Sequence, residues 1–410
     1  MSFDSAQDAS FGDAQGRFHV KRPFAVLLLA SLLVALFASG CISAAGSRGW
    51  ARPVQFGDLL LVSASKGKLD AIDPQTGDRK WRFPDDWRIE ESKARKLQGI
   101  YSQPEISGDT VFVGDYNGWV YAFKPSEASQ DAANRKPVGT YELRGAIVGG
   151  IHLDSGSETL YITTADGLLY ALNASDLKEA TSPGKNVRLL FAPVDAGDRI
   201  WTPPVVDSGR VYFGTTDGKL YALDAGTGAP VWEPFRASAA LVSTPVVSQG
   251  TVLVGGFDRR LYAIDASTGK ELWHFDATDW IWTKPLVESG TVYFGDFNGK
   301  VFAVSLADGK PVWDQPFDAG SSVRASPVTS SGNLVVANEA GDLFGLDIRT
   351  GSQVWGPIAL GKTLHADLLA SGSTVYVAPT GCVSEETGNK LYYYKVNTST
   401  RERQSTSSVC

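Results

Sequence analysis

The sequence has 410 residues, of which 43% are hydrophobic and 20% charged, and it contains 43 Gly and 20 Pro. These values are typical of a globular chain with many tight turns and exclude a collagen-like or disordered one. The formal net charge is −7 and the basic residues form no stripe, which excludes a nucleic-acid-binding surface.

Residues 1–40 are expected to be a lipoprotein-type signal peptide. Lys21 and Arg22 precede the apolar run Pro23–Gly40, which ends in small residues directly before Cys41. A charged start, an apolar run and small residues are typical of an export signal. The small residues followed by Cys41 also resemble the lipobox of bacterial lipoproteins, which implies cleavage before Cys41 and lipid attachment to its sulfur. The alternative is an uncleaved membrane anchor.

Residues 41–49 are rich in Ser, Ala and Gly and predict a short flexible tether. Residues 50–410 carry a repeat that is clearest at Val211–Trp232. In that unit we expect strands at Pro203–Val206, Val211–Phe213 and Leu220–Leu223, with a last strand opening at Pro230–Trp232. Turns at Asp217-Gly218 and Asp224–Gly228 separate the later strands.

An aromatic residue after the glycine turn marks each repeat. It stands at Tyr221, Tyr262, Phe302 and Phe344, with steps of 41, 40 and 42 residues. Weaker copies at Asp70, Tyr121, Tyr170 and Tyr392 extend the series to eight units. A period of about 40–50 residues with several strands in each unit predicts an all-β, eight-bladed β-propeller of four-stranded blades.

The end of each unit has its own pattern. Ala222, Asp224, Thr227, Gly228 and Trp232 recur with the same spacing at Ala263…Trp273 and Ala71…Trp81. We expect each tryptophan to pack against the neighbouring blade. The pattern resembles the tryptophan-docking repeat of the PQQ-like β-propeller superfamily. That superfamily includes quinoprotein alcohol dehydrogenases and the BamB-like lipoproteins of outer-membrane β-barrel assembly.

Eight units behind a lipobox look most like the BamB-like lipoproteins. This resemblance implies a non-catalytic protein-binding scaffold, exported and lipid-anchored to a bacterial membrane on its periplasmic or extracellular face. It also implies a protein partner in the cell envelope. An alternative is a glycan- or solute-binding surface lipoprotein.

A second alternative is a quinoprotein-type oxidoreductase that binds PQQ. By resemblance, such an enzyme needs an adjacent cysteine pair, a calcium site and a catalytic aspartate, whereas the three cysteines here are Cys41, Cys382 and Cys410. The four histidines share no ligand spacing with one another or with cysteine: His19, His152, His274 and His365. We therefore assign no catalytic, cofactor-binding or metal-binding residue.

Cys382 and Cys410 remain once Cys41 is assigned to the lipid. An even pair in an oxidising compartment predicts a disulfide, with two free thiols as the alternative.

The segments that lead into the presumed innermost strands place large side chains at equivalent positions. The candidate ring consists of Trp50, Tyr101, Trp201, Trp282, Arg324 and His365, with Val242 at the same position in unit five. One interpretation is that these side chains wedge between blades. The other is that the ring and the loops Pro84–Gly99 and Pro125–Gly139 form a partner-binding face.

Overall fold

The computed structural model describes residues 51–64, 68–83, 99–125, 137–179, 187–378 and 393–405. The chain divides into two units, Met1–Ala45 and Gly46–Cys410, and every described residue belongs to the second unit. The expected signal peptide and tether lie outside the described residues, as do Cys41, Trp50, Cys382 and Cys410. The loops Pro84–Gly99 and Pro125–Gly139 are described only at their ends.

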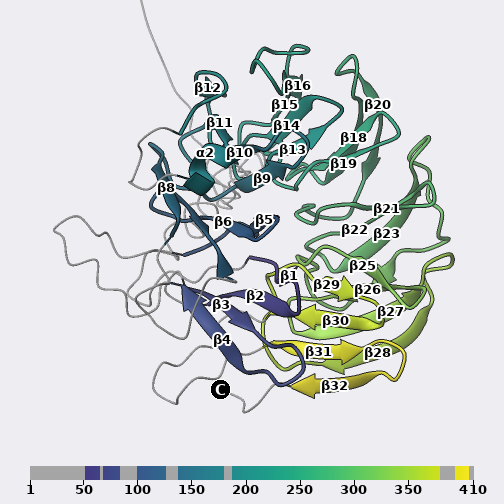
Figure 1. Cartoon of the computed structure of the whole chain (residues 1–410). Helices are drawn as coiled ribbons and strands as arrows, with labels where there is room; N and C mark the ends of the chain where they lie inside the picture. The colour runs from purple at the N-terminus through teal and green to yellow at the C-terminus, as the bar shows by residue number, and fades with distance from the viewer. Residues whose placement is uncertain are drawn as a thin grey trace, which may run out of the picture. The chain divides into compact units, whose positions relative to one another are not determined.

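The second unit is an all-β ring of eight antiparallel sheets of four consecutive strands, as the repeat predicts (Figure 1). In each blade the first strand is innermost and the last is outermost. Blades one to four contain β1 (Val54–Phe56), β2 (Leu59–Ala64), β3 (Lys68–Ile72), β4 (Arg79–Phe83); β5 (Glu105–Ser107), β6 (Thr110–Gly114), β7 (Trp119–Phe123), β8 (Gly139–Glu142); β9 (Gly150–Asp154), β10 (Thr159–Thr163), β11 (Leu168–Asn173), β12 (Val194–Asp195); and β13 (Val205–Asp207), β14 (Arg210–Gly214), β15 (Lys219–Asp224), β16 (Phe235–Arg236). Blades five to eight contain β17 (Val246–Ser248), β18 (Thr251–Gly255), β19 (Arg260–Asp265), β20 (Glu271–Asp276); β21 (Leu286–Glu288), β22 (Thr291–Gly295), β23 (Lys300–Ser305), β24 (Phe317–Asp318); β25 (Val328–Ser330), β26 (Asn333–Ala337), β27 (Asp342–Asp347), β28 (Gln353–Ala359); and β29 (Leu369–Ser371), β30 (Thr374–Val377), β31 (Tyr394–Asn397), β32 (Glu402–Ser405).

An aspartate closes the turn before the outermost strand. In blade five, Asp265 Oδ1 accepts the backbone N–H groups of Ser267 and Thr268 at 3.0 and 2.8 Å and the Thr268 hydroxyl at 2.9 Å. Hydrogen bonds from the Ser267 and Thr268 hydroxyls and these backbone groups lower the pKa of Asp265 to about 2. The turn residues that define the repeat in the sequence therefore hold the turn together.

The tryptophans pack against the neighbouring blade, as expected. Their indole N–H groups donate to backbone carbonyls of the next blade in three pairs: Trp232 to Ala266 at 3.2 Å, Trp273 to Leu306 at 3.0 Å, and Trp313 to Ile348 at 3.1 Å. Each ring also covers the turn glycine of that next blade, namely Gly269, Gly309 and Gly351. At the last junction Arg401 stands in the glycine position with φ 63°, and Trp355 covers Gly345 of its own sheet instead. The buried indole N–H of Trp355 has no acceptor among the described residues.

The prediction that a strand opens at Pro230–Trp232 is wrong. Only a single bridge joins Leu223 to Pro230, and the outermost strand β16 forms later, at Phe235–Arg236. Blade six repeats this interruption between Pro311 and β24. Proline lacks the N–H group that a ladder needs, and these segments carry a second proline, Pro234 or Pro316, directly before the short strand.

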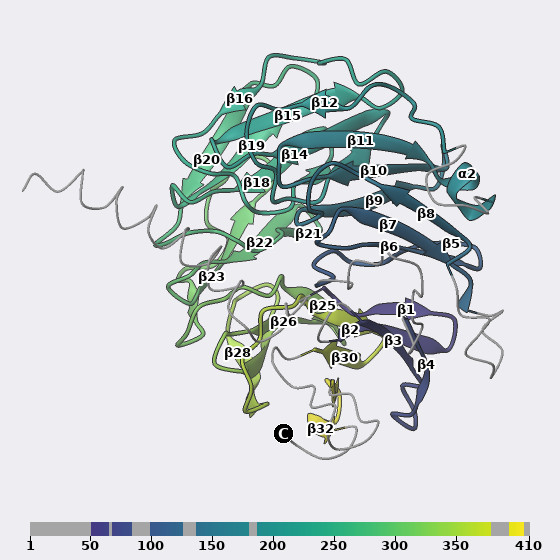
Figure 2. The ribbon, with the colours of Figure 1, turned by 90° about the vertical axis from the view of Figure 1, so that its left-hand side faces the viewer.

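Blade three departs from the repeat because a helix replaces its last turn. Asn173 caps the helix α2 (Ala174–Glu179) by accepting the backbone N–H of Asp176 at 2.9 Å. The helix lies beside β8 and β11 (Figure 2). The closing tryptophan that the sequence lacks here is replaced by Phe191, whose ring covers Gly228 of blade four.

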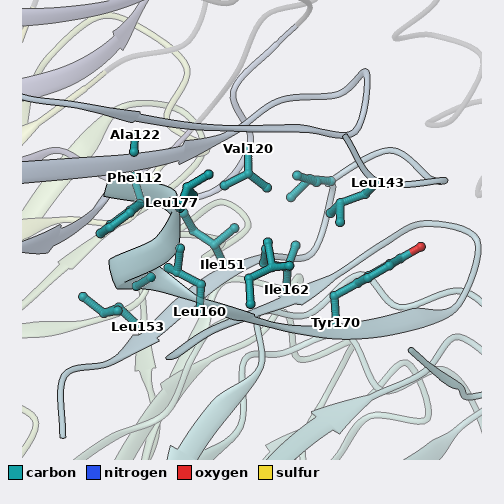
Figure 3. Packing of buried hydrophobic residues seen from close by; sticks show 13 residues of the cluster. Phe112, Val120, Ala122, Leu143, Ile151, Leu153, Leu160, Ile162, Tyr170 and Leu177 are labelled. Carbon is teal, nitrogen blue, oxygen red and sulfur yellow. The ribbon is translucent and has the colours of Figure 1, made fainter. Parts of the chain in front are cut away.

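The hydrophobic core is divided among the junctions between blades. Between blades two and three, Phe112 and Val120 pack against Ile151 and Ile162, with Leu177 of α2 in the same cluster (Figure 3). Such clusters are the interior that a single four-stranded sheet cannot form alone.

Blades one and eight lie side by side and close the ring (Figure 1). Side chains join the two blades. Leu60 and Ile72 of blade one share a buried cluster with Tyr376 and Tyr393. The Ser371 hydroxyl also donates to Gln55 Oε1 at 3.2 Å. Among the described strands, none is shared between the first and last sheets.

Candidate binding face

The predicted ring positions lie on one side of the propeller. In each of several blades the turn between the second and third strands donates a backbone N–H to the segment that leads into the innermost strand. Examples are Phe257 to Ala240 at 2.9 Å, Phe297 to Trp280 at 3.0 Å and Glu339 to Ser322 at 2.7 Å. These bonds bring the turn residues to the same side as the ring residues, and we call this side the turn face.

The ring residues differ in exposure. Tyr101 is buried at 9% exposure, with its ring edge-on to Tyr116 at 5.7 Å, and Val242 is buried at 4%. Trp201, Trp282, Arg324 and His365 are half-buried and keep part of their surface in water. The remaining member, Trp50, lies outside the described residues.

Four half-buried aromatic residues meet on the turn face, and we call them the aromatic quartet: Phe257, Trp280, Trp282 and Phe297. Phe257 stacks on Trp280 with a centroid distance of 4.6 Å and lies 5.8 Å from Trp282. Phe297 lies 5.8 Å from Trp280 and 6.3 Å from Trp282. The two tryptophans flank the buried Ile281, which fixes the segment to the core.

Sequence reasoning found only Trp282 of this quartet. The signal for two more was the hairpin turn itself, because Tyr116, Phe257 and Phe297 occupy the same turn position in their blades. Trp280 had no such signal, since its equivalents in neighbouring blades are Ala240 and Ser322.

A charged segment continues the quartet across blades six to eight. The Arg324 guanidinium lies over the Phe297 ring, 4.7 Å from its centroid, and its Nε is 3.3 Å from Glu339 Oε2. His365 Nε2 lies 3.0 Å from the other Glu339 oxygen, Oε1. Burial lowers the pKa of Arg324 and of His365, and Glu339 opposes both shifts. His365 is therefore mainly neutral at pH 7.

One rule relates the ring to the turns. Trp282, Arg324 and His365 each contact the turn residue of the preceding blade, which is Phe257, Phe297 and Glu339 in that order. Trp282, Arg324 and His365 thus bridge blades, and together with Trp201 they remain partly exposed. That the ring forms a partner-binding face stays a prediction.

A second polar group lies on the innermost strands. Glu105 and His152 stand at the position where the other described innermost strands carry Val or Leu. Burial raises the pKa of Glu105 to about 7, against a backbone hydrogen bond from Leu153 and the charges of Arg52 and Lys284. Burial also lowers the pKa of Lys284, whose side chain still reaches water.

The described residues form neither a cluster placed to bind a metal nor a helix suited to crossing a membrane. Within the described ranges, no group of three or more His, Cys, Asp or Glu side chains is placed to hold a metal ion. No helix in those ranges combines the length and apolar character needed to cross a bilayer. Lipid attachment at Cys41 and a disulfide between Cys382 and Cys410 concern residues outside these ranges and stay predictions.

Eight four-stranded blades joined by docked tryptophans define a PQQ-like β-propeller. A family model described as "Outer membrane protein assembly factor BamB" matches residues 39–180, 130–244 and 188–404. The chain belongs to this family.

Individual relatives match over shorter stretches. Outer membrane protein assembly factor BamB of Legionella pneumophila (strain Paris) is 27% identical over 176 residues, which are 43% of this chain and 40% of the relative. The quinoprotein ethanol dehydrogenase of Pseudomonas aeruginosa is 28% identical over 184 residues, 44% of this chain and 26% of the relative. The chain thus spans less than half the length of these curated relatives.

The crystal structure of BamB from Moraxella catarrhalis superimposes with a TM-score of 0.60 and 18% identity, over 80% of this chain and 91% of that one. At this identity the likeness concerns the fold.

Proposed function

We propose that this protein is a BamB-like scaffold: an exported, lipid-anchored propeller that binds envelope proteins and assists their assembly into an outer membrane. The observation that carries the proposal is the family match, which extends from residue 39 to residue 404 and includes every blade. The BamB relative of Legionella pneumophila supports the same role.

The anchor in this proposal is a lipid on Cys41. Residues 1–40 supply the export signal, and residues 41–49 separate the lipid from the propeller. In cells, Cys41→Ala should leave the protein unlipidated and move it from the membrane fraction to the soluble one. Retention of Cys41→Ala in membranes washed with salt would contradict the assigned anchor.

The binding surface in this proposal is the turn face around the aromatic quartet. Trp and Arg are the side chains most enriched at the energetic centres of protein interfaces, and large aromatic rings contribute contact area at low entropic cost. Here Trp280 and Trp282 are half-buried, so neighbouring side chains hold them while part of each ring can contact a partner. Arg324 extends the same surface with a charge.

The proposal is tested by crosslinking in intact cells, followed by purification of the lipoprotein and identification of its partners. We expect β-barrel assembly components with the wild type, and a loss of about tenfold or more when Trp280→Ala and Trp282→Ala are combined. Val312→Ala is the matched control, because Val312 is 43% exposed and lies on the outermost segment of blade six, away from the quartet. Equal recovery from the folded double variant and the wild type would refute the turn face as the binding surface.

The similarity to a quinoprotein ethanol dehydrogenase favours one other candidate, a PQQ-dependent oxidoreductase. The residues present do not fit that cofactor, because the sequence contains no adjacent cysteine pair. Calorimetric titration with PQQ and Ca²⁺ distinguishes the two functions. The scaffold function predicts no heat of binding, whereas saturable binding would favour the oxidoreductase.

A further inference from the structure

The outermost strand of each blade is a sheet edge, where backbone N–H and C=O groups face away from the ring. Exposed edges can pair with strands of other chains, and proteins block them with short strands, prolines, charges or covering segments. In seven blades the described edge is very short, contains or follows a proline, lies against a helix or carries basic side chains. The edge of blade five has none of these features, and its charged residues are the acidic Glu271 and Asp276.

Three edges are interrupted next to a proline. The outermost strands β12, β16 and β24 are two residues long and follow Pro193, Pro234 and Pro316. Two residues and a missing N–H group leave little backbone for a partner strand.

Other edges are covered or charged. The four-residue β8 lies against α2. The edge strand β4 carries Arg79, Lys80 and Arg82, and β32 carries Glu402 and Arg403.

The seven-residue β28 contains Pro357, and side chains occupy two of its carbonyls. The Gln353 amide donates to Gly356 O at 2.6 Å, and the Arg403 guanidinium donates to Ala359 O at 2.6 Å. The edge of β28 is therefore blocked although the strand is long.

In blade five, β20 runs for six residues, Glu271–Asp276, without a proline. It is the last strand of its sheet, paired on one side with β19. The Ala277 N–H donates to Arg259 O, and inward bonds alternate along an antiparallel ladder. His274 and Asp276 therefore direct their backbone N–H and C=O groups toward the free edge.

The side chains of β20 suit a pairing strand. Leu272 is 53% exposed, the highest value among the large hydrophobic residues described, and it lies where the register with β19 shifts. His274 and Asp276, beyond this irregularity, are exposed on one face of the strand. Trp273 and Phe275 point the other way, where Trp273 covers Gly309 and Phe275 packs against Phe294. One face of the strand is thus anchored to blade six while the other is open.

We propose that β20 is a β-augmentation site, at which an extended segment of a partner polypeptide adds a fifth strand to blade five. The segment carries an apolar residue opposite Leu272 and basic residues opposite Glu271 and Asp276. Backbone hydrogen bonds to His274 and Asp276 hold it in place, and the side-chain pattern selects it. The site lies on the outer rim and is independent of the turn face.

Charge argues against a second copy of this chain as the occupant. β20 carries two carboxylates: Asp276 lies 2.8 Å from Arg260 Nε, and Glu271 lies 2.6 Å from His274 Nδ1. Two copies would bring these acidic strands together, and each whole chain has a formal net charge of −7. A basic partner strand meets no such repulsion.

The test uses the mature protein and a fluorescein-labelled synthetic octapeptide that alternates valine and threonine between terminal lysines. Fluorescence polarisation should show saturable binding to the wild type. His274→Pro removes an outward N–H without removing a bond to β19, so binding should weaken about tenfold or more. Val312→Ala, at an exposed residue on the outermost segment of blade six, is the control and should keep the wild-type affinity within about threefold. Thermal unfolding of both variants checks that the propeller is intact.

A peptide with alternate amides N-methylated tests the same bonds on unmodified protein and should not bind. Asp276→Lys should weaken binding by charge reversal. The proposal is overturned if the octapeptide does not bind, if the N-methylated peptide binds equally, or if folded His274→Pro keeps the wild-type affinity. Dimerisation that His274→Pro abolishes would overturn the assigned occupant, and loss of binding in the Trp280→Ala, Trp282→Ala variant would place the peptide on the turn face instead.

Discussion

One substitution at Gly269 measures the docking contact between blades four and five. Gly269 has φ +71°, and a Cβ placed on it would lie 2.5 Å from Cδ2 and 2.8 Å from Cε3 of Trp232. Gly250 in the same blade has φ +76°, and a Cβ placed there would meet no heavy atom within 4 Å. Both Gly→Ala variants lose about 1–2 kcal/mol for a left-handed alanine. Only Gly269→Ala also displaces a docked ring.

Overpacking of this kind typically costs about 1–3 kcal/mol, so Gly269→Ala should lose that much more stability than Gly250→Ala. Urea unfolding followed by circular dichroism measures the difference, provided the two variants share one m-value. In a Trp232→Ala background the difference should vanish, because the ring is no longer there. Equal losses for the two variants in the wild-type background would refute the docking argument.

Three further predictions concern single contacts. The fully buried Asp70 carboxylate accepts two hydrogen bonds from the Arg82 guanidinium, at 2.6 and 2.8 Å, so Asp70→Ala should lower the free energy of unfolding in urea by about 3–5 kcal/mol. A loss as small as that of an exposed ion pair would contradict this. Trp313→Phe should cost about 1 kcal/mol more stability than Trp355→Phe, because of these two indole N–H groups only that of Trp313 has a described acceptor; matched melting curves check this. Burial raises the pKa of Glu105 from its ordinary 4.5 to about 7, so folding favours the protonated acid. The contribution of Glu105 to stability should be fully present below pH 4.5, fall by up to about 3 kcal/mol as pH rises to 7 and level off above it. It is measured as the difference between the wild type and Glu105→Gln, and a difference that does not change with pH would contradict this.

The blades were predictable because each unit carries its own local signals. The Asp265 turn and the docked Trp273 lie within one repeat, so spacing alone indicates both. The outermost strand of blade four was not, since it depends on how Pro230 and Pro234 interrupt a ladder that the hydrophobic pattern would continue. Phe191 is a substitute for tryptophan that only its contact with Gly228 identifies.

The candidate site was predictable only in part. Ring positions such as Trp282 and Arg324 stand before a recognisable strand pattern, so an alignment of units finds them. Their partners come from the preceding blade, about 25 residues earlier in the chain for Phe257 and Trp282. A contact of this kind depends on the angle between two blades, which no local pattern in the sequence encodes.

The side-chain seam between blades one and eight has a consequence for how such a chain can change. Leu60 and Tyr376 meet there as residues of neighbouring blades meet at every other junction, and no described strand crosses the seam. The termini could therefore be relocated to another junction without dividing a sheet. A circular permutant that begins just before β13 keeps all eight sheets whole, and we expect it to fold. In this architecture the chain can therefore be lengthened or shortened in evolution by one complete blade at a time.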